Sequence, residues 1–230
     1  MLYRMRISAD PRRRLQFPET AGAQGHILKG NWLVPVVVWF AAATFTYAAG
    51  TNTTTVQIAT NAVVGRPAHW AQPVKVSGIK NCFQVTTNLY RGAQPKAAGM
   101  KQLKEMGVKT VINLRARHSD KDEVAGTRLK SVRFEMEAWH GDEEDVVQFL
   151  RVVTDTNNLP AFIHCRRGAD RTGMMCAMYR VVVCGWTRED AITEMKKGGF
   201  GFSPVWRNLV KFVEKADVEK IKREAGLTGK

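Results

Sequence analysis

One stretch of twelve residues constrains this chain more than any other: Phe-Ile-His-Cys-Arg-Arg-Gly-Ala-Asp-Arg-Thr-Gly, at positions 162–173. The apolar residues 161–163 predict a buried strand, and the helical spacing of apolar residues from 174 to 183 predicts a helix. A tight loop between a strand and a helix aims several backbone N–H groups and the positive helix end at one point. The sequence therefore predicts a cradle for an anion between the two elements.

The side chains of this loop carry the groups that covalent phosphoryl transfer needs. Cys165 stands near a helix start among arginines, where the pKa of a thiol falls and the nucleophilic thiolate forms. Arg171 offers a rigid fork of N–H donors that matches phosphate oxygens in pairs. A nucleophile, an N–H cradle and a charge clamp together indicate phosphoryl transfer. The candidate phosphate-binding residues are Arg166, Arg167, Gly168, Ala169, Asp170, Arg171 and Thr172.

The signal is specific because spacing and context agree. Cysteine followed six residues later by arginine is weak by itself, whereas His-Cys-x-x-Gly-x-x-Arg-Thr-Gly between a strand and a helix is strong. Four cysteines in 230 residues do not indicate a disulfide framework, and a catalytic thiolate is most easily kept in a reducing compartment. The other three cysteines lack the arginine: Asn88, Val182 and Asp190 stand six residues after Cys82, Cys176 and Cys184.

Residues 164–173 resemble the signature loop of the cysteine-dependent protein tyrosine and dual-specificity phosphatases. Residues 88–95, 109–115 and 198–201 extend this likeness to small bacterial and plant-fungal dual-specificity-like members, over roughly residues 80–215. The resemblance implies that Cys165 is the nucleophile and Arg171 the phosphate clamp. It also implies that the reaction needs no metal and no cofactor.

Two aspartates are candidates for the general acid. Departure of the leaving group needs a proton from a carboxylic acid within hydrogen-bond reach. Relatives carry this aspartate on a loop before the cysteine, and here that region holds four acidic residues from Asp142 to Asp145, which also suit the start of a helix. Asp170 is the rival, because some lipid-directed and mycobacterial relatives carry an aspartate at this place. Asp142 and Asp170 are the two candidates.

The N-terminal part has a different composition from the rest. Residues 1–31 are polar and basic, and residues 32–49 contain no charge at all. At ~1.5 Å per residue such a helix barely spans a hydrocarbon core of ~30 Å. A membrane anchor and a cleaved secretory signal are both consistent with this pattern. Either one puts the basic end in the cytoplasm and the catalytic domain outside it, in the periplasm of a bacterium.

The remaining pattern predicts an α/β fold. Residues 50–75 are rich in Thr, Asn and Ala and predict a linker before a phosphatase domain at 76–230. Strands are expected at 82–89, 108–114, 131–136 and 161–163, and helices at 95–106, 143–157, 174–183, 188–197 and 205–215. This alternation predicts a largely parallel central sheet flanked by helices, as in tyrosine phosphatases, with the site at the carboxyl ends of the strands.

Three classes of function are compatible with a phosphate-binding loop. We favour a phosphomonoester phosphatase that acts through a cysteinyl-phosphate, on phosphoprotein or on lipid or inositol phosphates. A silent phosphate-binding module would tolerate the loss of Cys165, Arg171 and Thr172, and all three are present. A sulfur-transfer enzyme has less need of the arginine. The net charge of +14 suits anionic partners, including a membrane surface, but no basic platform interleaved with aromatics indicates nucleic acid.

Overall fold

The computed structural model describes residues 66–137 and 139–228. The expected basic segment 1–31, the apolar segment 32–49 and the linker up to residue 65 lie outside the described residues. Within the described ranges, no helix is both long and apolar enough to cross a bilayer.

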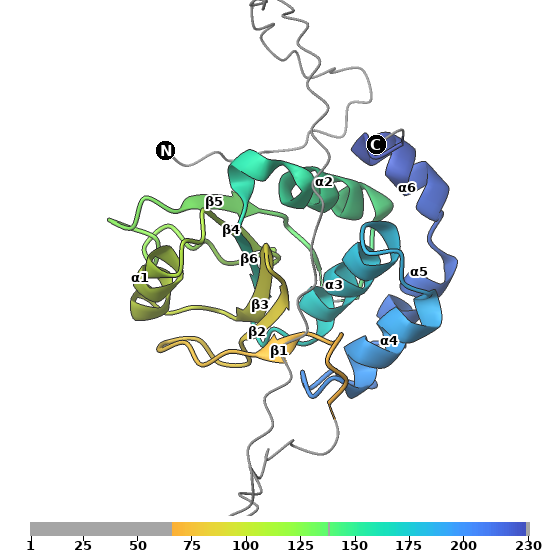
Figure 1. Cartoon of the computed structure of the whole chain (residues 1–230), viewed down its shortest axis with the longest axis horizontal. Coiled ribbons are helices and arrows are strands. Elements are labelled where there is room, and N and C mark those ends of the chain that lie inside the picture. The colour runs from red at the N-terminus through yellow and green to blue at the C-terminus, as the bar shows by residue number, and fades with distance from the viewer. Residues whose placement is uncertain (1–65, 138, 229–230) are drawn as a thin grey trace, which may run out of the picture. The chain divides into compact units, whose positions relative to one another are not determined.

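A six-stranded sheet forms the centre of the molecule, in the order β1-β2-β3-β6-β4-β5 (Figure 1). The strands β3, β6, β4 and β5 run parallel, whereas β1 and β2 are antiparallel to their neighbours. The sheet is therefore mixed and not largely parallel. The strands are β1 (Gln72–Pro73), β2 (Phe83–Thr86), β3 (Leu89–Ala93), β4 (Thr110–Asn113), β5 (Lys130–Arg133) and β6 (Ala161–Cys165).

The single strand expected at residues 82–89 is a hairpin, and this is why the sheet is mixed. The polar residues Thr87 and Asn88 turn the chain between β2 and β3, so that the two strands pair antiparallel. The strand β3 then continues to Ala93 and pairs in parallel with β6.

Helices cover both faces of the sheet. In Figure 1, α1 lies on one side of it and α2 to α6 lie on the other. Two apolar clusters fill the spaces between the layers, and alternate residues of β6 point to opposite faces: Phe162 packs in the cluster with α1, and Ile163 in the other. The helices are α1 (Ala97–Glu105), α2 (Glu143–Thr154), the 3₁₀ helix η1 (Thr156–Asn158), α3 (Asp170–Val182), α4 (Arg188–Lys197), α5 (Arg207–Lys215) and α6 (Val218–Ala225).

Local signals explain most helix boundaries. Thr187 Oγ1 accepts a hydrogen bond from the backbone N–H of Asp190 and caps α4. Gly107 follows α1 with φ +84°, which suits the residue after a helix. The helix α5 begins at Arg207, two residues later than the sequence predicts, and follows Trp206 without a side-chain cap.

The folded unit starts before residue 76. Gln72 and Pro73 form the edge strand β1, and Ala71 is buried. The N–H of Ala71 donates to Glu194 Oε1 over 2.6 Å, and Glu194 makes two hydrogen bonds with the buried Arg180, of 2.9 and 3.0 Å. Residues 66–75 are therefore part of the domain, and the expected domain boundary at residue 76 is too late.

Candidate active site

The candidate site lies where three parallel strands end. Cys165 is the last residue of β6, which is flanked by β3 and β4, and α3 begins five residues later at Asp170. The carboxyl ends of parallel strands are the usual location of a site in an α/β fold. The signature loop, defined here as residues 165–171, therefore connects a buried strand to a helix N-terminus, as the sequence predicts.

The neighbouring strand β3 fixes the shape of the loop. Gly168 has φ +69°, and a Cβ added there would lie 2.3 Å from the backbone carbon and oxygen of Gly92, so only glycine fits. The carbonyl oxygen of Gly168 accepts a 2.8 Å hydrogen bond from Arg91, which is fully buried with its guanidinium 3.7 Å from the ring centre of Phe200. Sequence reasoning missed this role of Arg91.

The environment of Cys165 favours its thiolate. Burial alone opposes ionisation, but hydrogen bonds from the Thr172 side chain and backbone, the charge of Arg171 and the N–H of Arg167 outweigh it and lower the pKa of Cys165. The Thr172 hydroxyl is buried and, among the described residues, makes no hydrogen bond to any other group. Burial instead raises the pKa of Cys82 and Cys176 to about 11.

The predicted clamp, Arg171, is held in place by the strand ends. Its NH1 group donates to the carbonyl oxygens of Leu114, 3.2 Å away, and Met136, 3.0 Å away. Leu114 follows β4, and Met136 follows β5. The groups that hold this guanidinium are neutral carbonyls, and no carboxylate of the described residues forms an ion pair with it. The positive charge of Arg171 is therefore available to an anion in the loop.

Two of the predicted phosphate-binding side chains make other contacts. Arg167 NH2 donates to the carbonyl oxygen of Gly201, 2.7 Å away, and Asp170 Oδ1 accepts a 2.8 Å hydrogen bond from the N–H of Ser203. Both contacts tie the signature loop to the segment 198–203, which also receives hydrogen bonds from Asn81 and Arg66. The side chain of Arg166 is exposed.

The two candidates for the general acid differ in their surroundings. Asp142 is exposed and caps α2, where it accepts a 3.0 Å hydrogen bond from the N–H of Glu144. Asp170 is buried and braces Ser203. A third carboxyl from the same acidic run was not singled out by the sequence: burial together with the charges of Asp142 and Glu144 raises the pKa of Asp145 to about 6.

A buried histidine and a buried aspartate are hydrogen-bonded directly behind Cys165. His164 Nε2 and Asp120 Oδ2 are 2.8 Å apart, and both side chains have no exposed surface. The other oxygen of Asp120 accepts hydrogen bonds from Gln94 at 2.7 Å and Asn113 at 3.0 Å. Sequence reasoning missed Asp120, which stands 44 residues away from His164.

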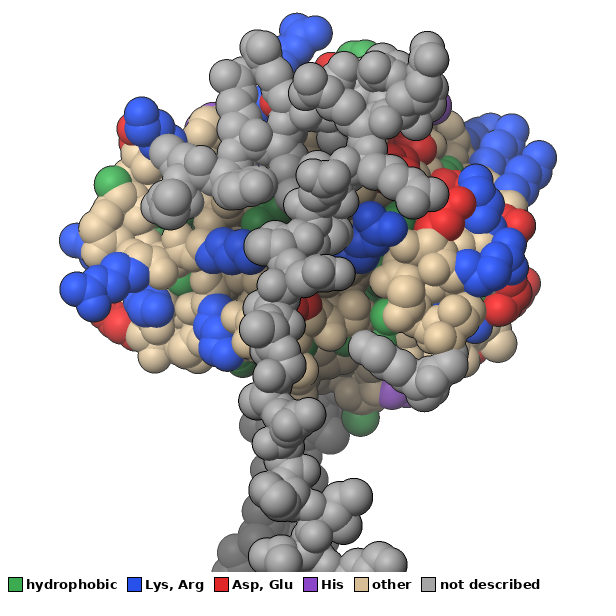
Figure 2. Space-filling view, turned by 90° about the horizontal axis from the view of Figure 1, so that it is seen from above, with side chains coloured by type: hydrophobic (Ala, Val, Ile, Leu, Met, Phe, Trp, Pro, Cys, Tyr) green, Lys and Arg blue, Asp and Glu red, His purple; other side chains and the backbone are tan. Residues whose placement is uncertain are grey.

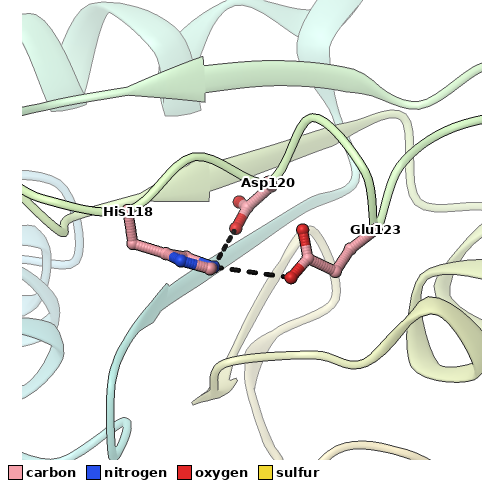
Figure 3. A group of neighbouring side chains, drawn as sticks. All are labelled: His118, Asp120 and Glu123. Atoms are coloured by element: carbon pink, nitrogen blue, oxygen red, sulfur yellow. Dashed lines mark ion pairs between the residues drawn. The ribbon is translucent and has the colours of Figure 1, made fainter.

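Figure 3 shows how Asp120 also faces His118 and Glu123, whose ligand atoms all lie within 4.8 Å of one another. His118 Nε2 is 3.8 Å from Asp120 and 3.5 Å from Glu123. Both oxygens of Asp120 already accept hydrogen bonds from other side chains. The Nε2 atom of His118 is buried and, among the described residues, has no hydrogen-bond partner, although it lies near both carboxylates.

Three features lie together at one edge of the sheet: a cysteine with a lowered pKa, a loop of N–H donors and an arginine that is free to bind an anion. Together they define a cysteine-based phosphatase. The comparisons with known proteins agree. A family model described as a DSP-PTPase phosphatase fused to NAD+ kinase matches residues 68–205. The chain belongs to this family of dual-specificity phosphatase-like domains, whose members are hydrolases.

Characterised relatives come from bacteria, plants and yeast. Dual specificity protein phosphatase TpbA of Pseudomonas aeruginosa is 33% identical over 158 residues, which cover 68% of this chain and 71% of that protein. Its crystal structure covers 70% of this chain and 99% of the solved chain, with a TM-score of 0.64 and 31% identity. Inositol diphosphatase DSP5 of Arabidopsis thaliana is 27% identical over 152 residues, 62% of this chain and 72% of that protein.

The likeness to the yeast protein concerns the fold. The catalytic core of the PP-IP phosphatase Siw14 from S. cerevisiae has a TM-score of 0.57 and 20% identity, over 67% of this chain and 98% of that one. This similarity agrees with the α/β architecture described above.

Proposed function

We propose that this protein hydrolyses phosphate monoesters through a cysteinyl-phosphate on Cys165, with phosphotyrosine-containing protein as the default substrate. The observation that carries the proposal is the lowered pKa of a cysteine that ends a buried strand beneath a loop of N–H donors. The names of the relatives support it, since TpbA is a dual specificity protein phosphatase and a further TpbA structure is described as a complex with pTyr.

The geometry supports a two-step reaction. In the first step the Cys165 sulfur attacks phosphorus, the S–P bond forms and the ester P–O bond breaks, while the leaving oxygen takes a proton from a carboxylic acid. Arg171 and the loop N–H groups stabilise the charge on the phosphoryl oxygens. In the second step the carboxylate takes a proton from water as the water oxygen attacks phosphorus, the S–P bond breaks, and inorganic phosphate and the thiolate are released. The Thr172 hydroxyl stabilises the departing sulfur.

The identity of the acid is tested by comparing leaving groups. An aryl phosphate with a good leaving group needs little protonation, whereas an alkyl phosphate needs much. We expect the true acid, changed to asparagine, to lower kcat for alkyl esters about 10²-fold or more and kcat for aryl esters far less. The variants are Asp142→Asn, Asp170→Asn and Asp145→Asn, measured on both substrates.

Asp122→Asn is the matched control, because Asp122 is an exposed aspartate that lies outside the acidic run at 142–145. A variant that loses activity equally on both esters is impaired in structure or binding and not in proton donation. If none of the three aspartates separates the two substrates, all three assignments are excluded. A selective loss in Asp145→Asn alone would replace both of the candidates taken from the sequence.

We also propose that the protein works at a membrane, with lipid or inositol phosphates as alternative substrates. The support is the uncharged run 32–49, the net charge of +14 and the Lys and Arg side chains on both flanks of the face in Figure 2. An anionic surface attracts each nearby basic side chain with ~1 kcal/mol. We expect lipid phosphates in vesicles to be hydrolysed at least as well as phosphotyrosine peptides, and removal of residues 1–49 to lower only the lipid rate.

The hydrolysis rates of the full chain and the truncated chain are measured on both substrates. Binding of each chain to the same vesicles is measured separately by sedimentation. The peptide rate is the internal control for folding of the truncated chain. A strong preference for phosphopeptide that the truncation leaves unchanged would exclude the lipid substrate and leave residues 32–49 as a targeting signal only.

A further inference from the structure

One buried cation takes no part in the reaction steps of Cys165 and Arg171. Arg91, on β3, is 1% exposed and is among the largest fully buried side chains of the described residues. Its NH2 group donates to the carbonyl oxygen of Gly168 over 2.8 Å, and its guanidinium lies 3.7 Å from the centre of the Phe200 ring. Its Nε is buried and has no hydrogen-bond partner among the described residues. The groups that hold this guanidinium are therefore a carbonyl and a ring, and both are neutral.

No carboxylate balances the charge of Arg91. In residues 66–137 and 139–228, none lies within ion-pair distance of it. The buried carboxylate of Glu194 is already bonded to Arg180 and to the N–H of Ala71. A buried charge without a counter-ion costs free energy. An anion bound near Cys165 would lower this cost.

The register of the sheet places Arg91 beneath the site. The strand β3 pairs in parallel with β6, so that Arg91 lies opposite Ile163 and Ala93 lies opposite Cys165. Alternate residues of a strand point to the same face of a sheet. Arg91 and Cys165 therefore point to the same face, on neighbouring strands and two residues apart in register.

The hydrogen bond from Arg91 acts on one peptide group of the signature loop. The peptide bond between Gly168 and Ala169 is trans, so its N–H points away from its C=O and away from Arg91. A cation at the C=O also polarises the peptide group and makes its N–H a stronger donor. Ala169 is 1% exposed and directly precedes α3, and its N–H makes no hydrogen bond within the described residues. Such an N–H at a helix start suits an anion.

We propose that Arg91 is a positioning residue for phosphate binding. It fixes the peptide group between Gly168 and Ala169 so that the Ala169 N–H faces the phosphoryl group, and its own charge is balanced when that group fills the loop. Arg171 binds the phosphoryl group directly, whereas Arg91 acts through the peptide group. The effect of Arg91 on catalysis rests on the proposed function, but its effect on phosphate binding does not.

The test measures binding of inorganic phosphate to the full chain by calorimetry. We expect Arg91→Met, which removes the charge and the donor, to weaken binding about ten-fold. Arg91→Lys keeps the charge and should weaken binding by a smaller factor. Arg180→Met is the matched control, because Arg180 is also buried and lies 4.2 Å from the Trp186 ring, but is paired with Glu194. It should lower the melting temperature and leave the phosphate affinity of the folded protein unchanged.

A second measurement uses the wild-type chain and does not depend on the folding of any variant. In ¹H–¹⁵N NMR spectra the amide proton of Ala169 should move downfield as phosphate is added, because its N–H then donates to a charged oxygen. An unchanged Ala169 signal overturns the inference. Equal losses of phosphate affinity in Arg91→Met and Arg180→Met, or in Arg91→Met and Arg91→Lys, also overturn it.

Turnover of p-nitrophenyl phosphate, measured separately on the same proteins, reports on the proposed function. A wild-type chain that binds phosphate through the Ala169 N–H but does not hydrolyse the ester would contradict the proposed function and support the role of Arg91. A chain that hydrolyses the ester with equal kcat/KM in wild type and Arg91→Met would support the proposed function and contradict the role of Arg91.

Discussion

Replacing Cys165 by serine is expected to abolish turnover of p-nitrophenyl phosphate while the chain stays folded. The site is built to hold a thiolate, since Thr172, Arg171 and the N–H of Arg167 together lower the pKa of Cys165 despite its burial. A serine hydroxyl is not ionised in this environment and is a far weaker nucleophile. Loss of the nucleophile in covalent catalysis costs on the order of 10⁴-fold or more in kcat. Steady-state kinetics with and without a chelator measure the loss and test the expected independence from metal ions.

Cys184→Ser is the control, because Cys184 is partly exposed and follows α3 well away from the helix start. It should retain wild-type activity. Iodoacetate provides a second measurement at about pH 6, where a thiol with an ordinary pKa is almost fully protonated. Cys165 should be alkylated under these conditions, whereas Cys82 and Cys176, each with a pKa of about 11, should not. Turnover by Cys165→Ser, or protection of Cys165 from alkylation, would contradict the mechanism.

The signature loop was predictable because its structure is local in sequence. An apolar run, a glycine that must take a positive φ and a helical apolar pattern follow one another within about twenty residues, and each acts on its immediate neighbours. The cap at Thr187 and the glycine after α1 were predictable for the same reason. Predicting these features does not require knowing which strands are neighbours in the sheet.

The supporting residues were not predictable because they depend on strand order. The strand β6 lies between β3 and β4, and this order brings Arg91, Gln94 and Asp120 behind the loop from 44 to 77 residues away. Arg91 and Asp120 are charged residues, which sequence patterns assign to the surface. In the structure each is buried because its hydrogen bonds go to the loop or to His164.

The acidic run at 142–145 shows a second limit of sequence reasoning. An aspartate that caps a helix and an aspartate that donates a proton occur in the same place and look the same in sequence. The structure shows that Asp142 does cap α2 and that Asp145 has a raised pKa. These observations identify different candidates, so kinetics with two leaving groups must decide between them.

Asp120→Asn is expected to lower the free energy of unfolding at neutral pH by about 2 kcal/mol, because it replaces a buried carboxylate acceptor and leaves hydrogen-bonding groups around it unsatisfied. One of these groups is His164, the residue immediately before Cys165, and the side chains of His164 and Asp120 are fully buried. Urea unfolding followed by circular dichroism measures the change. The substitution is nearly isosteric, so the loss reflects charge and hydrogen bonding and not a cavity.

The loss in Asp120→Asn should depend on pH with a definite sign. Burial alone would raise the pKa of the Asp120 carboxyl, but the hydrogen bond and attraction of His164, the hydrogen bond from Gln94 and the charge of His118 lower it in the folded protein. In the unfolded chain the pKa is the ordinary value of ~3.9. Between the two values the unfolded state binds more protons, so the stabilisation by Asp120 is complete above ~pH 4 and declines as the pH falls toward the folded pKa.

Wild type and Asp120→Asn should therefore differ most near neutral pH and converge in acid. The matched control is Asp122→Asn, an exposed aspartate two residues further along, which should unfold like the wild type at every pH. A constant difference between wild type and Asp120→Asn across the acid range would mean that the aspartate stabilises the fold by shape and not by charge. In that case the pair behind Cys165 could not be an ionic support for the nucleophile, and the tuning of the thiolate would rest on Thr172, Arg171 and the loop N–H groups alone.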